Sequence, residues 1–188
     1  MKDGMLLFHG SYCPVKTINL NKCMSGKDFG KGFYLTSDER QARNFIEASL
    51  SKAHDRGDAP LGQNFGYVSS FIFNDSGLAT YHFETTDREW LWFVSLNRNH
   101  GLARKLRPLI NPAIFDAEII SGKIANDRTN PTILAYLSGL FGDIMTDEVI
   151  DFAIKRLMAN RLKDQFCFLT ERAVKCLKFQ EARKYVIG

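Results

Sequence analysis

The order of strand-like and helix-like segments constrains the fold of this chain more than any other feature of its sequence. Short apolar runs typical of strands alternate irregularly with segments whose apolar residues recur at helical spacing. The sequence lacks the regular strand–helix–strand rhythm that would favour a doubly wound parallel sheet. The order therefore predicts an α+β fold with a mixed or mostly antiparallel sheet. The predicted strands are 6–9, 33–35, 67–73, 78–83, 115–124, 166–169 and 185–187.

Capping signatures predict where the helices begin. Thr36 with Glu39, and Thr86 with Glu89, have the spacing of a capping box. The second of these helices carries two tryptophans two positions apart, so we expect their rings to point in different directions. An apolar stripe on the first helix consists of Ala42, Phe45, Ile46, Leu50 and Ala53, and further helices are predicted to begin at Asn130, Thr146 and Thr170.

Length and composition favour one globular domain spanning residues 1–188. The chain contains 15 phenylalanines, which indicates a core of aromatic and β-branched residues and hence a sheet-rich domain. No stretch approaches the roughly 20 apolar residues of a membrane span. Only four apolar residues follow Met1–Gly4, too few for the core of a signal peptide. We therefore expect a cytoplasmic protein that makes no use of a membrane.

Cysteine usage and charge exclude several classes of site. The four cysteines form no CxxC pair and have no histidine at ligand spacing, so we expect thiols and no metal site. The net charge of +4 permits an anionic ligand or partner without requiring nucleic acid. The sequence also lacks GxxxxGK[ST], a GxGxxG between strand and helix, HExxH and GxSxG, which argues against P-loop, Rossmann, zinc-protease and serine-hydrolase readings.

Two segments near the N-terminus carry candidate binding residues. His9 and Gly10 lie at the end of the first predicted strand, where an imidazole can donate a hydrogen bond to a ribose hydroxyl and a glycine exposes its backbone. The alternative is a structural histidine beside a turn. Alternation in the second strand predicts that Phe33 faces the core and Tyr34 faces a cleft. Together these groups suit a planar, charged ligand bearing an amide, such as the nicotinamide of NAD.

Three later segments carry polar groups for which the sequence allows both a functional and a structural role. Gln165 can bind a ribose hydroxyl but cannot act as a base, and it can equally be a polar residue at a strand edge. Asn126 and Asp127 follow a predicted strand, where a catalytic carboxylate and a turn with a helix cap both fit. The basic stretch 98–107 can contact phosphate or form a solvated loop.

These segments, taken in order, resemble the ADP-ribosyltransferase superfamily. More narrowly, the chain is similar to a mostly bacterial domain family of unknown function assigned to that superfamily. The resemblance spans Leu6 to about Phe179. Its carriers are Leu7-Phe8-His9-Gly10-Ser11, Asp28-Phe29-Gly30-Lys31-Gly32-Phe33-Tyr34-Leu35-Thr36, Glu89-Trp90-Leu91-Trp92-Phe93, Gly122-Lys123-Ile124-Ala125-Asn126-Asp127 and Asp164-Gln165-Phe166-Cys167-Phe168.

The resemblance implies a fold and a set of site residues. The fold is a split, mixed β-sheet cleft with helices on its flanks. His9 would hold the NAD ribose, Gly10 the nicotinamide amide through its backbone, and Tyr34 would stack on the nicotinamide ring. Gln165 takes the third catalytic position, where related transferases often carry glutamate. Catalysis would then rely on Asp127 or Asp164, proceed with a changed acceptor, or be lost. Further residues expected at the NAD site are Ser11, Phe29, Gly32, Phe33, Thr36 and Asn126.

The resemblance also implies an activity. It is an NAD-dependent mono-ADP-ribosyltransferase that releases nicotinamide and modifies a macromolecular acceptor, either protein or nucleic acid. A degenerate module that binds NAD or ADP-ribose, and an NAD glycohydrolase, are the alternatives. A toxin-like role follows from the family alone, and the oligomeric state is left open.

Overall fold

A computed structural model describes residues 1–124, 130–157 and 163–187. Within these ranges strands and helices mix along the chain, which confirms the predicted α+β class. The strands are β1 (Leu6–Ser11), β2 (Phe33–Leu35), β3 (Phe65–Phe73), β4 (Thr80–His82), β5 (Ile119–Lys123), β6 (Asp164–Phe168) and β7 (Leu177–Val186). The α-helices are α1 (Glu39–Arg56), α2 (Arg88–Arg98), α3 (Ala103–Leu106), α4 (Asn130–Leu137), α5 (Asp147–Arg156) and α6 (Glu171–Lys175), and the 3-10 turns are η1 (Leu20–Lys22), η2 (His100–Leu102), η3 (Arg107–Leu109) and η4 (Pro112–Ile114).

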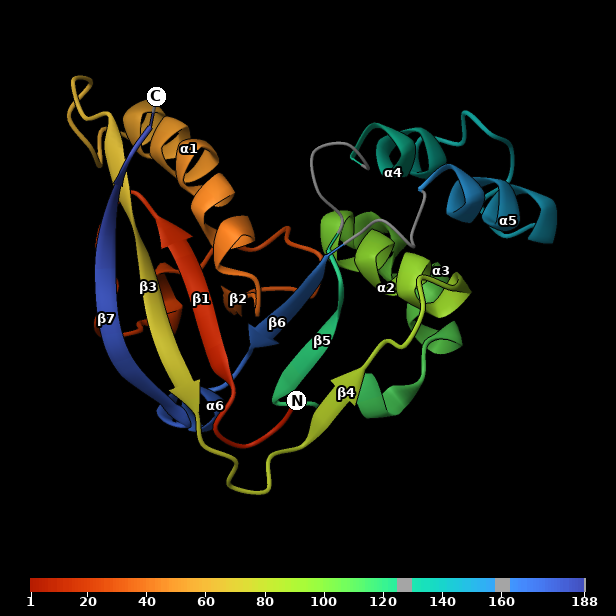
Figure 1. Cartoon of the computed structure of the whole chain (residues 1–188). Coiled ribbons are helices and arrows are strands. Elements are labelled where there is room, and N and C mark those ends of the chain that lie inside the picture. Colours follow the sequence, from red (N-terminus) through yellow and green to blue (C-terminus); the bar gives the residue numbers. More distant parts are fainter. Residues whose placement is uncertain (125–129, 158–162, 188) are drawn as a thin grey trace.

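The strands form two sheets that stand side by side (Figure 1). The first sheet has the order β1-β3-β7 and is antiparallel throughout. The second has the order β2-β6-β5-β4, in which β4 and β5 are parallel and the other pairs antiparallel. A single bridge between Phe8 and Thr36 joins them. The mixed, mostly antiparallel pairing is therefore as predicted.

Helix α1 covers one face of the first sheet. Its buried residues repeat the predicted stripe, except that Phe45 is 44% exposed and does not belong to the core. The predicted cap is also wrong: α1 begins after Asp38, whose carboxylate accepts a hydrogen bond from the Gln41 amide at 3.2 Å. Thr36 instead makes backbone bonds to Phe8, and its Oγ1 accepts from the Asp38 amide, so the helix begins two residues later than predicted.

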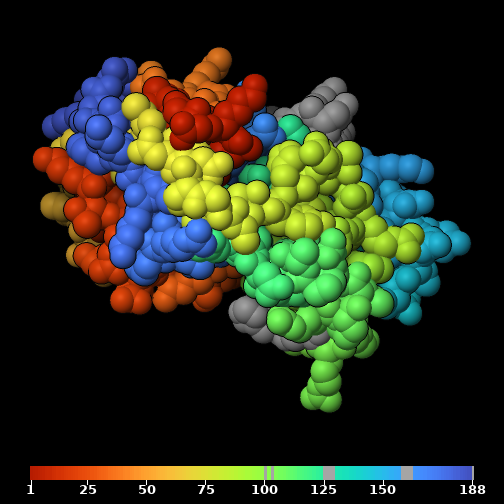
Figure 2. Space-filling model, turned by 90° about the horizontal axis from the view of Figure 1, so that it is seen from below, coloured from red at the N-terminus to blue at the C-terminus, as the bar shows by residue number. Residues whose placement is uncertain are grey.

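Two hydrophobic clusters flank the second sheet. One lies between the sheets and is built on aromatic and aliphatic side chains such as Leu7, Phe33 and Phe71. The other lies under α2, α4 and α5 and buries both tryptophans, Trp90 and Trp92. Helix α2 begins after Asp87, so the predicted cap at Thr86 is one residue early. Seen from below, the molecule has two lobes, with the green to cyan segments gathered in one of them (Figure 2).

Strand lengths differ from the predicted ones for local reasons. β5 begins at Ile119 because Pro112 starts a 3-10 turn and the chain then turns again before the sheet. β7 is ten residues long because all but one of its residues pair with β3 around a bulge at Gln180. No helix in the described ranges is both long enough and apolar enough to cross a bilayer.

Candidate functional site

Among the described residues one bridge joins the two sheets, and the sheets separate immediately after it. Phe8 and Thr36 exchange two backbone hydrogen bonds, of 2.8 and 3.0 Å. In an antiparallel ladder Gly10 and Tyr34 would form the next pair. Instead, the Tyr34 carbonyl lies 2.8 Å from Nδ1 of His9. The imidazole therefore occupies the acceptor that a continuing ladder would use, and the sheets part at this point.

Gly10 presents its backbone to the gap so created. Alternate residues of a strand direct their N–H and C=O groups to the same edge, so those of Gly10 point to the side on which Phe8 meets Thr36. No ladder between the described strands uses them. The glycine itself is required by α1, because an added Cβ would lie 1.8 Å from the Ala42 carbonyl oxygen. A buried backbone donor and acceptor thus stand together at the junction.

The hydrogen bond of His9 fixes its tautomer. A carbonyl oxygen only accepts, so Nδ1 carries the hydrogen and Nε2 is the acceptor nitrogen of the neutral ring. Burial lowers the pKa of His9, and the bond to the Tyr34 carbonyl offsets part of that effect. The ring lies against Phe33, with centroids 4.5 Å apart. A ribose hydroxyl would therefore donate to His9, the reverse of the predicted direction.

Tyr34 is held from its hydroxyl end. Its Oη donates to the Gly30 carbonyl at 2.8 Å and accepts from the Phe29 amide at 2.9 Å. Burial raises the pKa of Tyr34, so the phenol stays neutral. Its ring packs on the cluster under α2, whereas Phe33 packs between the sheets, so the two side chains lie on opposite faces as predicted, but Tyr34 packs on a hydrophobic cluster and not in the predicted cleft. His9 lies on the Phe33 face, so the His9 and Tyr34 side chains occupy opposite faces and meet through the Tyr34 carbonyl.

Gln165 belongs to a buried polar network on the Tyr34 face. It is 4% exposed, and its Nε2 donates to Oδ2 of Asp28 at 2.8 Å and to the Lys123 carbonyl at 3.4 Å. The other oxygen of Asp28 accepts from Arg98, at 2.6 Å to Nη2 and 3.0 Å to Nε. Because Nε2 is anchored, Gln165 offers its Oε1 as an acceptor.

Asp28 is the functional candidate that sequence reasoning missed. It is 6% exposed and places a carboxylate directly beside the third predicted catalytic position. It opens the motif of residues 28–36 that contains Tyr34, so its position was visible, but its partner Gln165 is 137 residues away in the chain. Asp164 does not fill this place, because neighbouring strand residues point to opposite faces and its carboxylate pairs with Lys123 Nζ at 2.9 Å. Asn126 and Asp127 lie outside the described residues.

The remaining predicted site residues serve packing and capping. Phe29 and Phe33 are core residues, at 1% and 5% exposure. An added Cβ on Gly32 would lie 2.5 Å from the Cys167 sulfur, so the glycine allows close packing of strands. Thr36 Oγ1 contacts Gln41 and accepts from the Asp38 amide, and Ser11 is buried at the end of β1.

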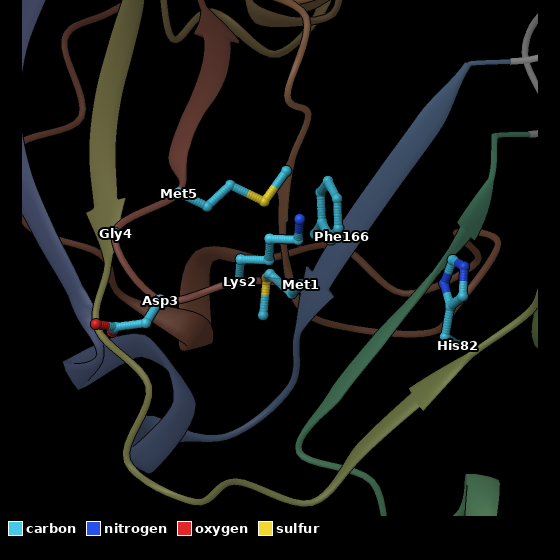
Figure 3. Close-up of a pocket in the computed structure, with 7 residues that line it drawn as sticks. All are labelled: Met1, Lys2, Asp3, Gly4, Met5, His82 and Phe166. Carbon is cyan, nitrogen blue, oxygen red and sulfur yellow. The ribbon is translucent and has the colours of Figure 1, made fainter.

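Two cavities lie elsewhere on the molecule, and of the predicted site residues only Phe29 lines one of them, the smaller. The larger, about 500 Å³, is bounded by the N-terminal segment 1–5, Phe166 and His82 (Figure 3). There His82 Nδ1 is 2.9 Å from Ser121 Oγ. The smaller, about 360 Å³, lies between α2, η3, η4 and the second sheet. Neither cavity is lined by His9, Gly10, Tyr34 or Gln165, and the residues described hold no group of three metal-ligating side chains.

Fold and junction define an α+β protein whose two sheets share one backbone bridge. The chain belongs to a family described as a protein of unknown function (DUF3990), which matches residues 5–179. No curated protein matches the chain, and no solved structure matches it. The family match covers the same part of the chain as the resemblance found in the sequence, which spans Leu6 to about Phe179. The relation to the ADP-ribosyltransferase superfamily stays a prediction.

Proposed function

We propose that this protein binds NAD and transfers ADP-ribose to a protein or nucleic-acid acceptor, releasing nicotinamide. The observation that carries the proposal is the pair of Gly10 backbone groups at the point where the sheets part. A primary carboxamide has one acceptor and one N–H₂ donor, which complement the N–H and C=O of a single residue in an extended strand. Because Gly10 is buried, the neighbouring segments must part as the ligand enters.

The other groups at the junction suit the rest of the ligand. His9 Nε2 can accept a hydrogen bond from a ribose hydroxyl, and the ring is fixed for this by Nδ1. Tyr34 reaches the junction through its carbonyl, whereas its ring lies on the opposite face of β2, where it packs on the cluster under α2 and is held by two bonds to the 29–30 loop. Stacking of this ring on nicotinamide is therefore a requirement that the proposal adds. In the reaction the bond between nicotinamide and ribose breaks with its electron pair going to nicotinamide. An acceptor oxygen or nitrogen forms the new bond to the ribose carbon and gives up its proton.

Labelled NAD and a cell extract test the proposal. We expect release of nicotinamide and label on a macromolecule, with digestion by protease or nuclease identifying the acceptor class. His9→Gln should lower turnover at least about tenfold, since it loses the ring acceptor, whereas His82→Gln at the distant cavity should not. A protein that binds NAD by calorimetry yet neither releases nicotinamide nor labels an acceptor would rule the proposal out.

The second candidate function is a module that binds NAD without catalysing a reaction, and the presence of Gln165 favours it. A neutral amide cannot stabilise the positive charge that develops on the ribose, and the nearby Asp28 is paired with Arg98. Gln165→Glu alone would put two carboxylates within 2.8 Å, where they would share a proton.

The double variant Asp28→Asn with Gln165→Glu exchanges the amide and the carboxylate, so the network keeps one negative charge, now at position 165 instead of beside Arg98. If the wild type is a binding module, this exchange should create or strongly increase turnover, and Asp28→Asn alone should not. Turnover by the wild type would exclude the module. Free ADP-ribose as the sole product would identify an NAD glycohydrolase instead.

A further inference from the structure

We propose that the smaller cavity is a separate binding site for a small planar aromatic anion. The cavity is called here the aromatic pocket, and the proposal does not depend on the proposed function. It lies against α2 and the second sheet and has a volume of about 360 Å³, within the range of small-molecule sites. Its lining residues are Phe29, Gly30, Phe93, Leu96, Asn97, Arg107, Ile114, Phe115, Ile120 and Leu169.

Three phenylalanines form a connected aromatic wall. Phe93 is 6.2 Å from Phe29 and 6.2 Å from Phe115 between ring centroids, at interplanar angles of 34° and 63°. Two of the three rings are almost fully buried, so the wall is rigid. Aromatic walls of this kind favour flat apolar bodies, which gain from stacked and edge-on contacts.

A cation stands at the rim of the pocket. The Arg107 guanidinium lies over the Phe115 ring, 3.9 Å from its centroid. No carboxylate within 1–124, 130–157 or 163–187 forms an ion pair with it. A guanidinium stacked by its face keeps its N–H edge available, and that edge matches a carboxylate bidentately.

An acceptor faces the same space. Both hydrogens of the Asn97 side-chain amide are used, by the Asp28 carbonyl at 3.1 Å and the Phe93 carbonyl at 3.0 Å. Its Oδ1 is turned toward Gly30, since a Cβ added there would lie 3.2 Å from it. The pocket therefore offers an aromatic body, one cationic edge and one acceptor. This combination selects a flat aromatic carboxylate that also carries a hydroxyl or N–H group.

The pocket is distinct from the junction but shares a loop with it. Gly30 lines the pocket, and its carbonyl accepts the Tyr34 hydroxyl. None of His9, Gly10 or Gln165 lines the pocket. A ligand bound here would consequently touch the segment that holds Tyr34 without covering the Gly10 edge.

Calorimetry with 6-hydroxy-2-naphthoate tests the proposal. We expect saturable one-to-one binding, with 2-naphthol, which lacks the anion, binding at least about tenfold more weakly. Arg107→Gln should weaken binding of the naphthoate about tenfold or more and leave 2-naphthol unaffected. Arg104→Gln, on the exposed face of α3, is the matched control and should change neither.

Three results would overturn the proposal: no binding of the naphthoate at millimolar concentration, equal affinity for 2-naphthol, or an Arg107→Gln protein that binds as the wild type does. Competition distinguishes this site from the proposed NAD site. Saturating NAD should leave naphthoate binding in place, and displacement by NAD would show that the pocket belongs to the NAD site. If the protein does not bind NAD at all, the proposed function is wrong, but the proposal for the aromatic pocket is unaffected.

Discussion

The junction at His9 and Gly10 lies on β1, and the network around Asp28 and Gln165 lies on the far side of β2 from it, where Gln165 belongs to β6. The two regions differ in how their polar groups are paired. In the network the Asp28 carboxylate is paired with Arg98 and Gln165, and the Gln165 Nε2 also donates to the Lys123 carbonyl. At the junction the His9 imidazole binds the Tyr34 carbonyl, and the N–H and C=O of Gly10 belong to no ladder between the described strands.

This difference separates structure from recognition. Polar groups that complete one another in the interior stabilise a unique fold, and removing one of them is costly. Polar groups that a fold leaves at an edge are available to a ligand. The comparison therefore assigns the network to positioning and the junction to binding, and each assignment can be broken by mutation.

The largest effect is expected from Asp28→Ala. It removes the carboxylate that joins Arg98 to Gln165, and breaking a buried ion pair costs about 3–5 kcal/mol. Urea unfolding measures the change. Asp55→Ala, on the exposed side of α1, is the control and should stay within about 0.5 kcal/mol. A small loss for Asp28→Ala would mean that the network does not hold the second sheet together.

Gly10→Ala comes next. The new methyl group would meet the Ala42 carbonyl at 1.8 Å, so α1 must move away from β1, and such overpacking costs about 1–3 kcal/mol. Gly62→Ala is matched to it, because an added Cβ there has no neighbour within 4 Å. Equal stability of the two variants, measured by urea unfolding, would contradict the close approach of α1 to the junction.

Tyr34→Phe should cost less. The Phe29 amide loses its acceptor and the Gly30 carbonyl its donor, and such a loss is worth about 1–2 kcal/mol. The variant should also loosen the 29–30 loop, visible as faster exchange of the Phe29 amide. Tyr67→Phe is the comparison variant, since the described contacts give its hydroxyl no hydrogen bond. Unchanged exchange at Phe29 would argue against a tethered Tyr34.

The smallest effect is a dependence of stability on pH. The pKa of His9 is lowered in the folded state, so above its unfolded value of about 6.5 the ring is neutral in both states and no stability is lost. As pH falls below that value the unfolded chain binds the proton first, and stability decreases by at most about 1.4 kcal/mol per pH unit until the folded pKa is reached. Urea midpoints between pH 7.5 and 5 should show this loss in the wild type and less of it in His9→Gln. Parallel curves would mean that His9 does not titrate on unfolding.

The sequence predicted the elements better than their ends. Alternation correctly placed Phe33 and Tyr34 on opposite faces, because strand geometry alone decides that, but it could not show that the face of Tyr34 is covered by the cluster under α2. Capping was wrong at Thr36 and Thr86, since in each case an aspartate one or two residues further on is free to accept from the first turn. Phe45 sits at helical spacing but is exposed, because spacing defines an apolar stripe without deciding which residues at its margin reach the sheet.

The sequence predicted which residues belong to the site but not how their side chains are arranged in space. His9 and Gly10 were identified by their place at a strand end, which is local information. Their relation to Tyr34 depends on where a ladder between two sheets stops, and the role of Asp28 depends on contacts with Gln165 and Arg98, 137 and 70 residues away. Such long-range pairings leave no mark on spacing or composition.

The interrupted ladder has a consequence for isotope exchange. Along β1 the amide hydrogens of Leu7, Phe8 and His9 are each opposite a carbonyl of a neighbouring strand, whereas that of Gly10 is not. In deuterated water the Gly10 signal should fade before those of the three preceding residues, and a carboxamide ligand seated at the junction should slow it. The exchange rate of the Gly10 amide hydrogen would then report whether a ligand occupies that edge of β1.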